Sequence, residues 1–367
     1  MLVYRFICGL LSVCLAGMAM ADSAEERFRQ AFSGLSTPSS MAITAGFVTG
    51  DGPAVLLATG PRFKGSTQSV PEDARWHVGS LTKSFTATLL ARMAERGEID
   101  FAAPLANLLP EFAPEMHPDW QSLTLIEILS HTAGLPANFT NAEMEKPGGP
   151  DHVHERLLRL RAHWGTPLPG TRGKFTYSNM GYVLAGFIAE TRAGSRWQDL
   201  ILREIAQPLN LTSLGFGAPR GNADPWGHTA RFLRQTPVEP TDPWSDNPAW
   251  LGPAGTLHMS IADLLTWGQT HMRACRGELP EFLSAESCTL LHTPVSSGYA
   301  LGWVVDDLAW LGGGVIHTHN GSNTMWFAEL AYAPDRDMVL AVILNQARAM
   351  KASRAMSVLG NALVGQD

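Results

Sequence analysis

The chain has 367 residues, of which 45% are hydrophobic and 17% charged, and its formal net charge is −7. This length and composition describe a globular protein with a sizeable core, built as one large domain or two interleaved ones. The negative charge argues against a nucleic-acid-binding protein, which usually carries a basic surface patch.

The first 21 residues have the organisation of a secretory signal peptide. Arg5 supplies a positive charge, Phe6 to Gly17 forms an apolar stretch, and Ala19-Met20-Ala21 is a small-x-small cleavage motif. The apolar stretch is short for a membrane-spanning helix. We therefore expect cleavage at the end of this motif, a periplasmic or secreted protein, and no stable membrane span afterwards. A lipoprotein is not expected, because Val13 before Cys14 is too large for the usual lipobox.

The first elements after this leader are a helix, a hairpin and a second helix. Residues 24–35 have helical spacing. Two strand-like runs, 41–48 and 53–59, are joined by the glycine-containing turn Thr49-Gly50-Asp51-Gly52, which is a hairpin signal. A helix then begins at Ser80 and ends at about Arg96, before Gly97.

The middle of the chain is helical and rich in loops to about residue 251. We expect helices over residues 124–130, 152–162, 180–191 and 196–207. The segment 219–253 is rich in proline, tryptophan and glycine, and it predicts an irregular loop.

Strand signals return near the end of the chain, over residues 299–305, 314–319, 325–332 and 338–344, before a last helical segment at about 347–363. Strands at both ends predict an α/β (α+β) fold: an antiparallel sheet flanked by helices and built from both chain ends, with an all-helical insertion. We expect a sheet subdomain over residues 22–79 and 255–367, and a helical subdomain over 80–254.

The strongest chemical signal lies where the second helix begins. Ser80 and Lys83 are three residues apart, so their side chains share one face of the helix. A serine is a poor nucleophile until a neighbouring base takes its proton, and a lysine can be that base when its pKa is lowered. The pair alone proves little, because Ser-x-x-Lys is common by chance.

Three further segments carry compatible chemistry. Phe175-Thr176-Tyr177-Ser178-Asn179 offers a loop tyrosine that can shuttle protons and an amide that can orient a lysine. His317-Thr318-His319-Asn320-Gly321-Ser322 lies on an expected strand, where glycine lets a substrate approach the backbone. Ser130-His131-Thr132-Ala133-Gly134-Leu135-Pro136 ends a helix and turns sharply, and we expect His131 to be structural there.

In this order, the motifs resemble the serine β-lactamase and penicillin-binding protein superfamily. The similarity is to the branch of class C β-lactamases and D-alanyl-D-alanine carboxypeptidases, which also holds esterases and D-aminopeptidases. It extends over about residues 40 to 345 and includes Leu251-Gly252-Pro253-Ala254-Gly255-Thr256-Leu257, Tyr299-Ala300-Leu301-Gly302-Trp303 and Ala333-Pro334-Asp335.

The resemblance implies a catalytic centre made of three side chains. Ser80 would be the acylated nucleophile, and Lys83 would accept its proton. Tyr177 would act as the base or carry protons to the leaving group and from the deacylating water. The sequence leaves open whether Lys83 or Tyr177 is the acylation base.

The resemblance also implies the surroundings of the substrate. Asn179 would hold the lysine and the substrate amide, while His319 and Gly321 would line the neighbouring strand. The backbone N–H groups of Ser80 and Ser322 would form the oxyanion hole.

One position departs from the β-lactamase pattern. Class C β-lactamases carry Lys-Thr-Gly on this strand, whereas this chain has His319-Asn320-Gly321. An ordinary histidine is mostly neutral at pH 7, so recognition of a β-lactam or peptide carboxylate should be weaker. Some carboxypeptidases, aminopeptidases and esterases of the superfamily also have histidine here. Acyl-serine chemistry is expected to remain.

We expect no metal and no cofactor. His152-Val153-His154 falls on an expected helix, where residues i and i+2 do not face each other. His317 and His319 would face the same way on a strand, but no carboxylate or cysteine ligands accompany them. The sequence leaves open whether Cys275 and Cys288 pair in an oxidising compartment.

The leading hypothesis is a secreted serine hydrolase acting on a small-molecule or peptide substrate: a D-alanyl peptide, a β-lactam-like compound, an ester or an amide. An alternative is a catalytically silent peptidoglycan-binding module, against which the intact set of motif residues argues. A metallohydrolase is disfavoured by the poor ligand inventory. The oligomeric state is not indicated by the sequence.

Overall fold

The computed structural model describes residues 24–145, 151–231, 234–307 and 313–365. The expected signal peptide, with Cys14 and its cleavage motif, lies outside this part of the chain. Within the described residues, no helix is long and apolar enough to cross a membrane.

The main sheet has six antiparallel strands in the order β2-β1-β11-β10-β9-β8, so two strands from the start of the chain lie beside four from its end. Its strands are β1 Ile43–Thr49, β2 Val55–Thr59, β8 Val304–Asp307, β9 Val315–Ser322, β10 Phe327–Ala333 and β11 Met338–Leu344. The predicted α/β class, with an antiparallel sheet built from both ends, is confirmed.

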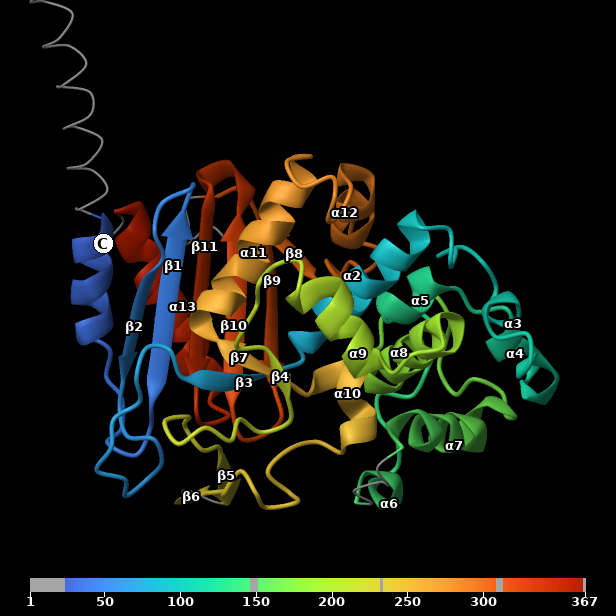
Figure 1. Cartoon of the computed structure of the whole chain (residues 1–367), viewed down its shortest axis with the longest axis horizontal. Helices are drawn as coiled ribbons and strands as arrows, with labels where there is room; N and C mark the ends of the chain where they lie inside the picture. The colour runs from blue at the N-terminus through green and yellow to red at the C-terminus, as the bar shows by residue number, and fades with distance from the viewer. Residues whose placement is uncertain (1–23, 146–150, 232–233, 308–312, 366–367) are drawn as a thin grey trace, which may run out of the picture.

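Helices cover both faces of this sheet (Figure 1). Side chains alternate along β11, so Leu340 and Val342 face one core and Val339 and Ala341 face the other. The first core is closed by residues 24–33 and by α13 Ala349–Val364, and the second by α11 Ile261–Cys275. Burial on both faces explains why β11 is apolar at every position.

Most of the remaining helices form a group beside the sheet, coloured from cyan through green to gold in Figure 1. These elements are α2 Thr82–Glu95, α3 Leu105–Leu108, η1 Ala113–Glu115, α4 Pro118–Gln121, α5 Leu125–Leu129, α6 Asn141–Met144, α7 His152–Trp164, α8 Asn179–Ala193, α9 Trp197–Ile201, η2 Leu202–Ala206, η3 Ala249–Leu251 and α10 Gly252–Gly255. Helices α2, α8 and α10 contact one another at the centre of this group.

A second sheet of three strands, β3-β7-β4, connects the helices to the main sheet, because β3 contacts β9 and β10. It consists of β3 Arg75–Gly79, β4 Gly215–Phe216 and β7 Leu257–Ser260, and a separate hairpin consists of β5 His228–Arg231 and β6 Arg234–Pro237. Strands β4, β5 and β6 fall within residues 80–254, where helices and an irregular loop, but no strands, were expected. The subdomain boundaries themselves remain a prediction.

Two predicted elements differ from the structure. The strand expected over 299–305 begins only at Val304, because Gly298 and Gly302 have positive φ angles that interrupt extended backbone. The helix expected over 196–207 changes to π geometry at Leu202. Helix α12 Ala285–His292 and helix α11 were not predicted. A disulfide between Cys275 and Cys288 joins the end of α11 to the middle of α12.

Candidate active site

Ser80 lies at the point where β3 ends and α2 begins. The preceding Gly79 has φ +53°, and a Cβ atom there would lie 2.3 Å from the backbone nitrogen of Ser322. A side chain at position 79 would therefore collide with the neighbouring strand, and glycine is required for this turn. The turn leaves Ser80 half-buried and places Lys83 on the first turn of α2, fully buried.

Three oxygen atoms surround the amine of Lys83. Nζ lies 3.0 Å from Ser80 Oγ, 2.7 Å from Asn179 Oδ1 and 2.6 Å from the carbonyl oxygen of Ala254. Burial lowers the pKa of Lys83 well below its ordinary value, because the charged ammonium loses its water shell. The neutral amine is therefore favoured far more than in an exposed lysine.

The number of N–H groups on the neutral amine of Lys83 determines whether it donates to Ser80 or accepts a proton from it. A neutral amine has two N–H groups and one lone pair. Asn179 Oδ1 and the Ala254 carbonyl can only accept, so they take the two N–H groups. The lone pair is then left for Ser80 Oγ, whose hydroxyl can donate to Lys83. This is the arrangement that a general base needs beside a nucleophile.

Tyr177 contacts the same serine from the other side of the lysine. Burial raises the pKa of the Tyr177 phenol, and its hydrogen bond with Ser80 opposes that rise. Nζ of Lys83 lies 4.9 Å from the centre of the tyrosine ring. Burial therefore lowers the pKa of Lys83 and raises the pKa of Tyr177. It favours a neutral lysine that can act as a base and a protonated phenol that can donate.

Asn179 begins α8, and the turn before it is held by hydrogen bonds. Ser178 caps the helix by accepting from the backbone N–H of Gly181. The backbone N–H of Ser178 donates to Nδ1 of His131, which has φ +64° in the turn after α5. His131 thus fixes the loop that presents Tyr177 and Asn179, in agreement with the structural role expected for it.

His319 lies on β9 and is buried. Burial lowers its pKa to about 3, with a further contribution from the positive charge of Lys83. Nδ1 lies 2.5 Å from the carbonyl oxygen of Asn320, which can only accept, so this nitrogen carries the hydrogen. Nε2 then accepts from the Tyr299 hydroxyl at 2.9 Å. The imidazole is neutral and both of its nitrogens are occupied.

Gly321 brings β9 into backbone contact with the nucleophile turn. A Cβ atom at this position would lie 2.0 Å from the carbonyl oxygen of Val78 and 2.5 Å from the backbone nitrogen of Ser80. The next residue, Ser322, uses its side-chain oxygen to bond Trp326 and Thr324 in the turn that follows. The backbone segments of Ser80 and Ser322 therefore lie side by side, as an oxyanion hole requires.

A buried pair near the nucleophile, His77 and Asp246, was not predicted from the sequence. Nδ1 of His77 accepts from the backbone N–H of Gly79, and its Nε2 lies 2.7 Å from Asp246 Oδ1. The same carboxylate oxygen accepts from Asn323 Nδ2 at 2.8 Å. Asp246 thus ties the nucleophile turn to the loop that follows β9. His77 lies only three residues before Ser80, but its partner is far away in sequence.

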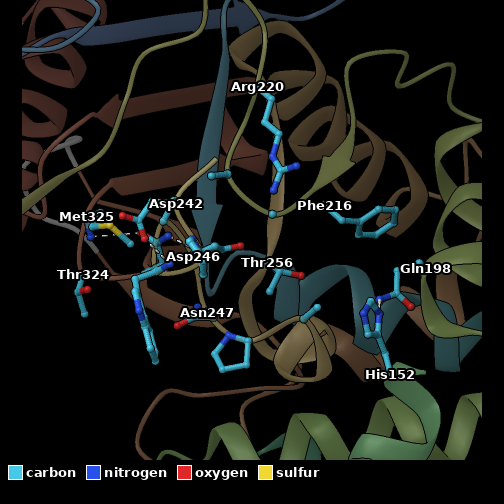
Figure 2. Close-up of a pocket in the computed structure, with 18 of the residues that line it drawn as sticks. His152, Gln198, Phe216, Arg220, Asp242, Asp246, Asn247, Thr256, Thr324 and Met325 are labelled. Carbon is cyan, nitrogen blue, oxygen red and sulfur yellow. Dashed lines mark hydrogen bonds between the residues drawn. The ribbon is translucent and has the colours of Figure 1, made fainter. Parts of the chain in front are cut away.

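A pocket of about 680 Å³ lies beside this loop (Figure 2). Asn247, one of its lining residues, donates from Nδ2 to the carbonyl oxygen of Gly255, and a Cβ at Gly255 would lie 3.5 Å from Gly79. Ser80, Lys83 and Tyr177 do not line this pocket, which is connected to the nucleophile turn only through the contacts of Asn247 and Gly255. Its lining combines apolar side chains such as Phe216 and Trp244 with the guanidinium of Arg220.

Comparisons with known proteins agree with this geometry. The family model described as Beta-lactamase matches residues 28–361. Penicillin-binding protein 4 of Amycolatopsis lactamdurans is 26% identical over 316 residues, which cover 80% of this chain and 78% of that protein. Other curated relatives are longer, and this chain spans about half of their length.

Solved structures share the fold. A D-stereospecific amidohydrolase from Streptomyces sp. has a TM-score of 0.70 and 21% identity, with 94% of this chain and 99% of that chain covered. A class C beta lactamase from Rhodobacter sphaeroides has a TM-score of 0.65 and 22% identity, with the same coverage. At these identities, the similarity shows the fold alone.

Proposed function

The chain belongs to the beta-lactamase family and is a serine hydrolase, and on that basis we propose that it cleaves an amide or ester through an acyl-enzyme on Ser80. The observation that carries the proposal is the position of Lys83 Nζ, 3.0 Å from Ser80 Oγ and buried, with its two N–H groups directed to other acceptors. A base arranged in this way can take the serine proton as the bond to the substrate carbonyl forms.

The proposed reaction assigns the other residues by their proton state. Lys83 accepts the proton of Ser80, and Tyr177, kept protonated by burial, donates a proton to the leaving group. The N–H groups of Ser80 and Ser322 stabilise the tetrahedral oxyanion. In deacylation, the same groups act in reverse on a water molecule. Asn179 holds the lysine through Oδ1 and donates one N–H of Nδ2 to Asn138 Oδ1, so its second N–H can bind the substrate.

The proposed substrate is an amide or ester of a D-amino acid that needs no carboxylate contact on β9. His319 is neutral, and Tyr299 occupies its outer nitrogen, so this strand offers no cation to a carboxylate. The similarity to a penicillin-binding protein and to a D-stereospecific amidohydrolase of the same fold supports this substrate class.

We also propose that the enzyme works outside the cytoplasm. The support is the sequence of residues 1–21, with its charged start, apolar stretch and small-x-small motif. Amino-terminal sequencing of the protein recovered from the periplasm or medium tests this. A start at Asp22 is expected, and recovery of the uncleaved chain from the cytoplasm would contradict it.

The test of the chemistry uses residues 22–367 with a D-aminoacyl anilide, an activated ester and a fluorescent penicillin. We expect hydrolysis of the first two, and a mass adduct that maps to Ser80. Ser80→Ala should remove both. Ser69→Ala, at an exposed serine outside the site, should behave as the parent protein. Adducts that persist in Ser80→Ala would overturn the nucleophile assignment.

Two outcomes would instead support the alternatives. Binding of a peptidoglycan fragment without turnover or adduct formation, for any probe, would favour a silent binding module. Loss of hydrolysis on treatment with EDTA, with activity restored by a divalent metal, would favour a metallohydrolase.

A further inference from the structure

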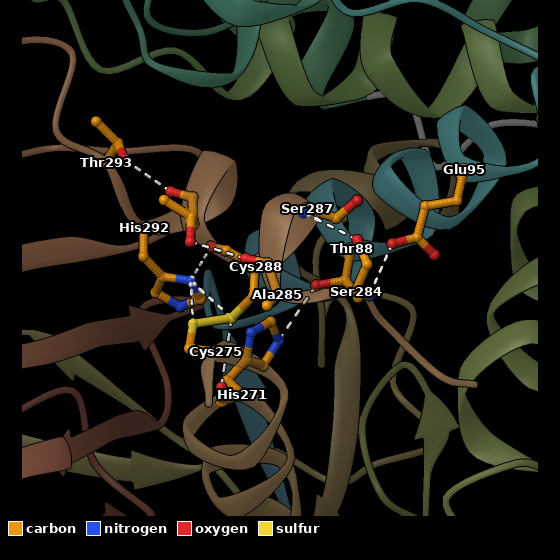
Figure 3. Close-up of a disulfide and its surroundings, with 11 residues drawn as sticks. Thr88, Glu95, His271, Cys275, Ser284, Ala285, Ser287, Cys288, His292 and Thr293 are labelled. Carbon is orange, nitrogen blue, oxygen red and sulfur yellow. Dashed lines mark hydrogen bonds between the residues drawn. A yellow bond between two sulfur atoms is a disulfide. The ribbon is translucent and has the colours of Figure 1, made fainter. Parts of the chain in front are cut away.

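A repeated pattern of histidine and cysteine lies at the junction of α11 and α12. His271 and Cys275 are four residues apart on α11, and Cys288 and His292 are four residues apart on α12. Residues i and i+4 share a helix face, so each helix presents one imidazole and one sulfur together. The disulfide holds these two faces against each other, and Figure 3 shows both imidazoles beside the sulfur atoms.

Three of the four side chains bring their ligand atoms close together in a buried position, and the fourth, Cys275, is joined to them by the disulfide. Ligand atoms of His271, Cys288 and His292 all lie within 4.8 Å of one another. Nδ1 of His292 is 3.6 Å from the Cys275 sulfur and 3.5 Å from the Cys288 sulfur. His271, Cys288 and His292 are buried, while Cys275 is half-buried and gives a reductant access to the bond.

The hydrogen bonds of His271 leave one nitrogen free with its lone pair. Thr88 on α2 gives its hydroxyl hydrogen to the carbonyl oxygen of Ser84, so Thr88 Oγ1 accepts from Nε2–H of His271 at 3.2 Å. Nδ1 therefore carries no hydrogen and is buried without a partner among the described residues. A metal-binding histidine has this form: one nitrogen oriented by an outer hydrogen bond and the other available.

His292 also has one ring nitrogen that donates a hydrogen bond and one that carries only a lone pair, although its donor nitrogen is Nδ1 rather than Nε2. Its Nδ1 lies 2.7 Å from the carbonyl oxygen of Cys288, which can only accept, so Nδ1 carries the hydrogen. Nε2 is then a lone-pair atom, and it too is buried without a partner among the described residues. Two orphaned imidazole nitrogens on the histidines that flank one disulfide are unusual, because buried polar atoms are nearly always satisfied.

We propose that this cluster is a redox-gated metal site, in which reduction of the Cys275–Cys288 disulfide creates a Cys₂His₂ site for Zn²⁺ with His271 and His292. In the oxidised protein, each sulfur is bonded to the other and neither is a thiolate, so the metal has only two ligands. After reduction, the four ligands of a closed structural zinc site are present. The site is separate from the catalytic groups and independent of the proposed function.

The balanced steps are simple. A dithiol reductant breaks the S–S bond and gives two electrons and two protons to the sulfurs, forming two thiols and its own cyclic disulfide. Zn²⁺ then displaces both thiol protons and binds two thiolates and two neutral imidazoles. Zinc–ligand bonds of about 2.0–2.3 Å require ligand atoms roughly 3.3–3.8 Å apart. The separations of up to 4.8 Å among His271, Cys288 and His292 must therefore contract by about 1 Å after reduction, and the freed Cys275 sulfur must join them. The ring of His292 must also turn its Nε2 towards the sulfurs, because Nδ1 is the nitrogen that lies 3.5–3.6 Å from them in the oxidised protein.

The test titrates the reduced protein, freed of dithiol in oxygen-free buffer, with Co²⁺ and then Zn²⁺. We expect one Co²⁺ per chain, with the visible bands of tetrahedral coordination and a sulfur-to-cobalt charge-transfer band, both removed by Zn²⁺. Bound Zn²⁺ should also protect both thiols from alkylation, as read by mass spectrometry. The oxidised protein should show neither band.

Two variants and a control locate the ligands. His271→Gln and His292→Gln should each weaken Co²⁺ binding at least tenfold. His154→Gln, at an exposed histidine of α7, should not. Circular dichroism verifies that each variant is folded. Protection of both thiols from alkylation by Zn²⁺ is measured in the unmutated protein, so it does not depend on whether a variant folds. Binding that is equal in oxidised and reduced protein, or unchanged in both histidine variants, would overturn the proposal, as would absence of binding to the reduced form.

Discussion

The hydroxyl of Tyr299 lies 2.9 Å from Nε2 of His319 and donates a hydrogen bond to the neutral form of that histidine. The other ring nitrogen donates to the carbonyl oxygen of Asn320, so the tyrosine must be the donor in this pair. A protonated imidazole would have hydrogens on both nitrogens and would lose the hydrogen bond that it accepts from Tyr299. Burial and the nearby charge of Lys83 act in the same direction.

This pair predicts that His319→Lys increases reactivity with penicillin. A lysine at this position would supply the positive charge that the strand lacks for a substrate carboxylate. A hydrogen bond to a charged group contributes about 1.5–3 kcal/mol, which corresponds to a roughly 10- to 100-fold gain in the acylation rate constant. The measurement is the rate of fluorescent penicillin labelling of Ser80.

The control for this prediction is a neutral activated ester, which has no carboxylate to contact. Its turnover by His319→Lys should change much less than penicillin labelling. A parallel rise for both compounds would show that the lysine acts on the serine rather than on the carboxylate. A fall in penicillin labelling with the fold intact would contradict the prediction.

Removal of the base should have a large effect on acylation. Lys83→Met keeps an unbranched side chain of similar volume but removes the group that takes the proton of Ser80. General base catalysis contributes about 10²- to 10⁴-fold, so kcat should fall by about that factor. Burst kinetics with an activated ester would measure the acylation step directly. A loss below tenfold would show that Tyr177, and not Lys83, is the acylation base.

The depressed pKa of Lys83 also predicts the acid limb of the pH profile. Only the neutral amine can accept a proton, so activity should rise with pH through the lowered pKa of this lysine and remain high above it. The limb therefore lies well below the pH at which an ordinary lysine titrates. The kcat/KM profile of the free enzyme measures it. An acid limb near the ordinary lysine pKa would mean that the amine is charged at neutral pH.

The order of the motifs was enough to predict much of the site. Ser80, Lys83, Tyr177 and Asn179 do lie together, because a helix spacing and a helix start fix their local directions. Their catalytic roles remain a prediction until measured. What the sequence did not indicate are partners distant in the chain, such as Asp246 for His77, which tertiary contacts alone bring together.

Elements with strong local sequence signals were predicted, and elements with weaker signals were not. The hairpin of β1 and β2 follows from its glycine turn. Helix α11 was missed although Ser260 caps it by accepting from the backbone N–H of Asp263, which is a recognisable helix start. The His-x₃-Cys and Cys-x₃-His spacing was missed with it, because that pattern has meaning only once both segments are known to be helical.

The buried His319 predicts a loss of stability in acid. Its pKa in the folded protein is about 3, against an ordinary value near 6.5, so the unfolded chain binds its proton first as pH falls. Its contribution to stability is complete above about pH 6.5 and is lost progressively towards pH 3, by about 1–2 kcal/mol at pH 5. Urea unfolding at pH 7 and pH 5 measures the change. His319→Asn should reduce this pH dependence, and an unchanged slope would mean that other groups account for it.

Gly321 gives the sharpest geometric prediction. A Cβ atom at this position would lie 2.0 Å from the carbonyl oxygen of Val78 and 2.5 Å from the backbone nitrogen of Ser80, so Gly321→Ala must separate β9 from the nucleophile turn. Because an oxyanion-hole donor contributes about 10²- to 10³-fold to kcat, a fall of that size is expected if the N–H groups of Ser80 and Ser322 form the hole. Gly165→Ala is the matched control, since a Cβ there meets its nearest neighbour at 3.7 Å. Esterase kinetics and thermal unfolding should be recorded for both variants. If Gly321→Ala stays folded and retains the parent kcat, β9 does not supply the oxyanion hole.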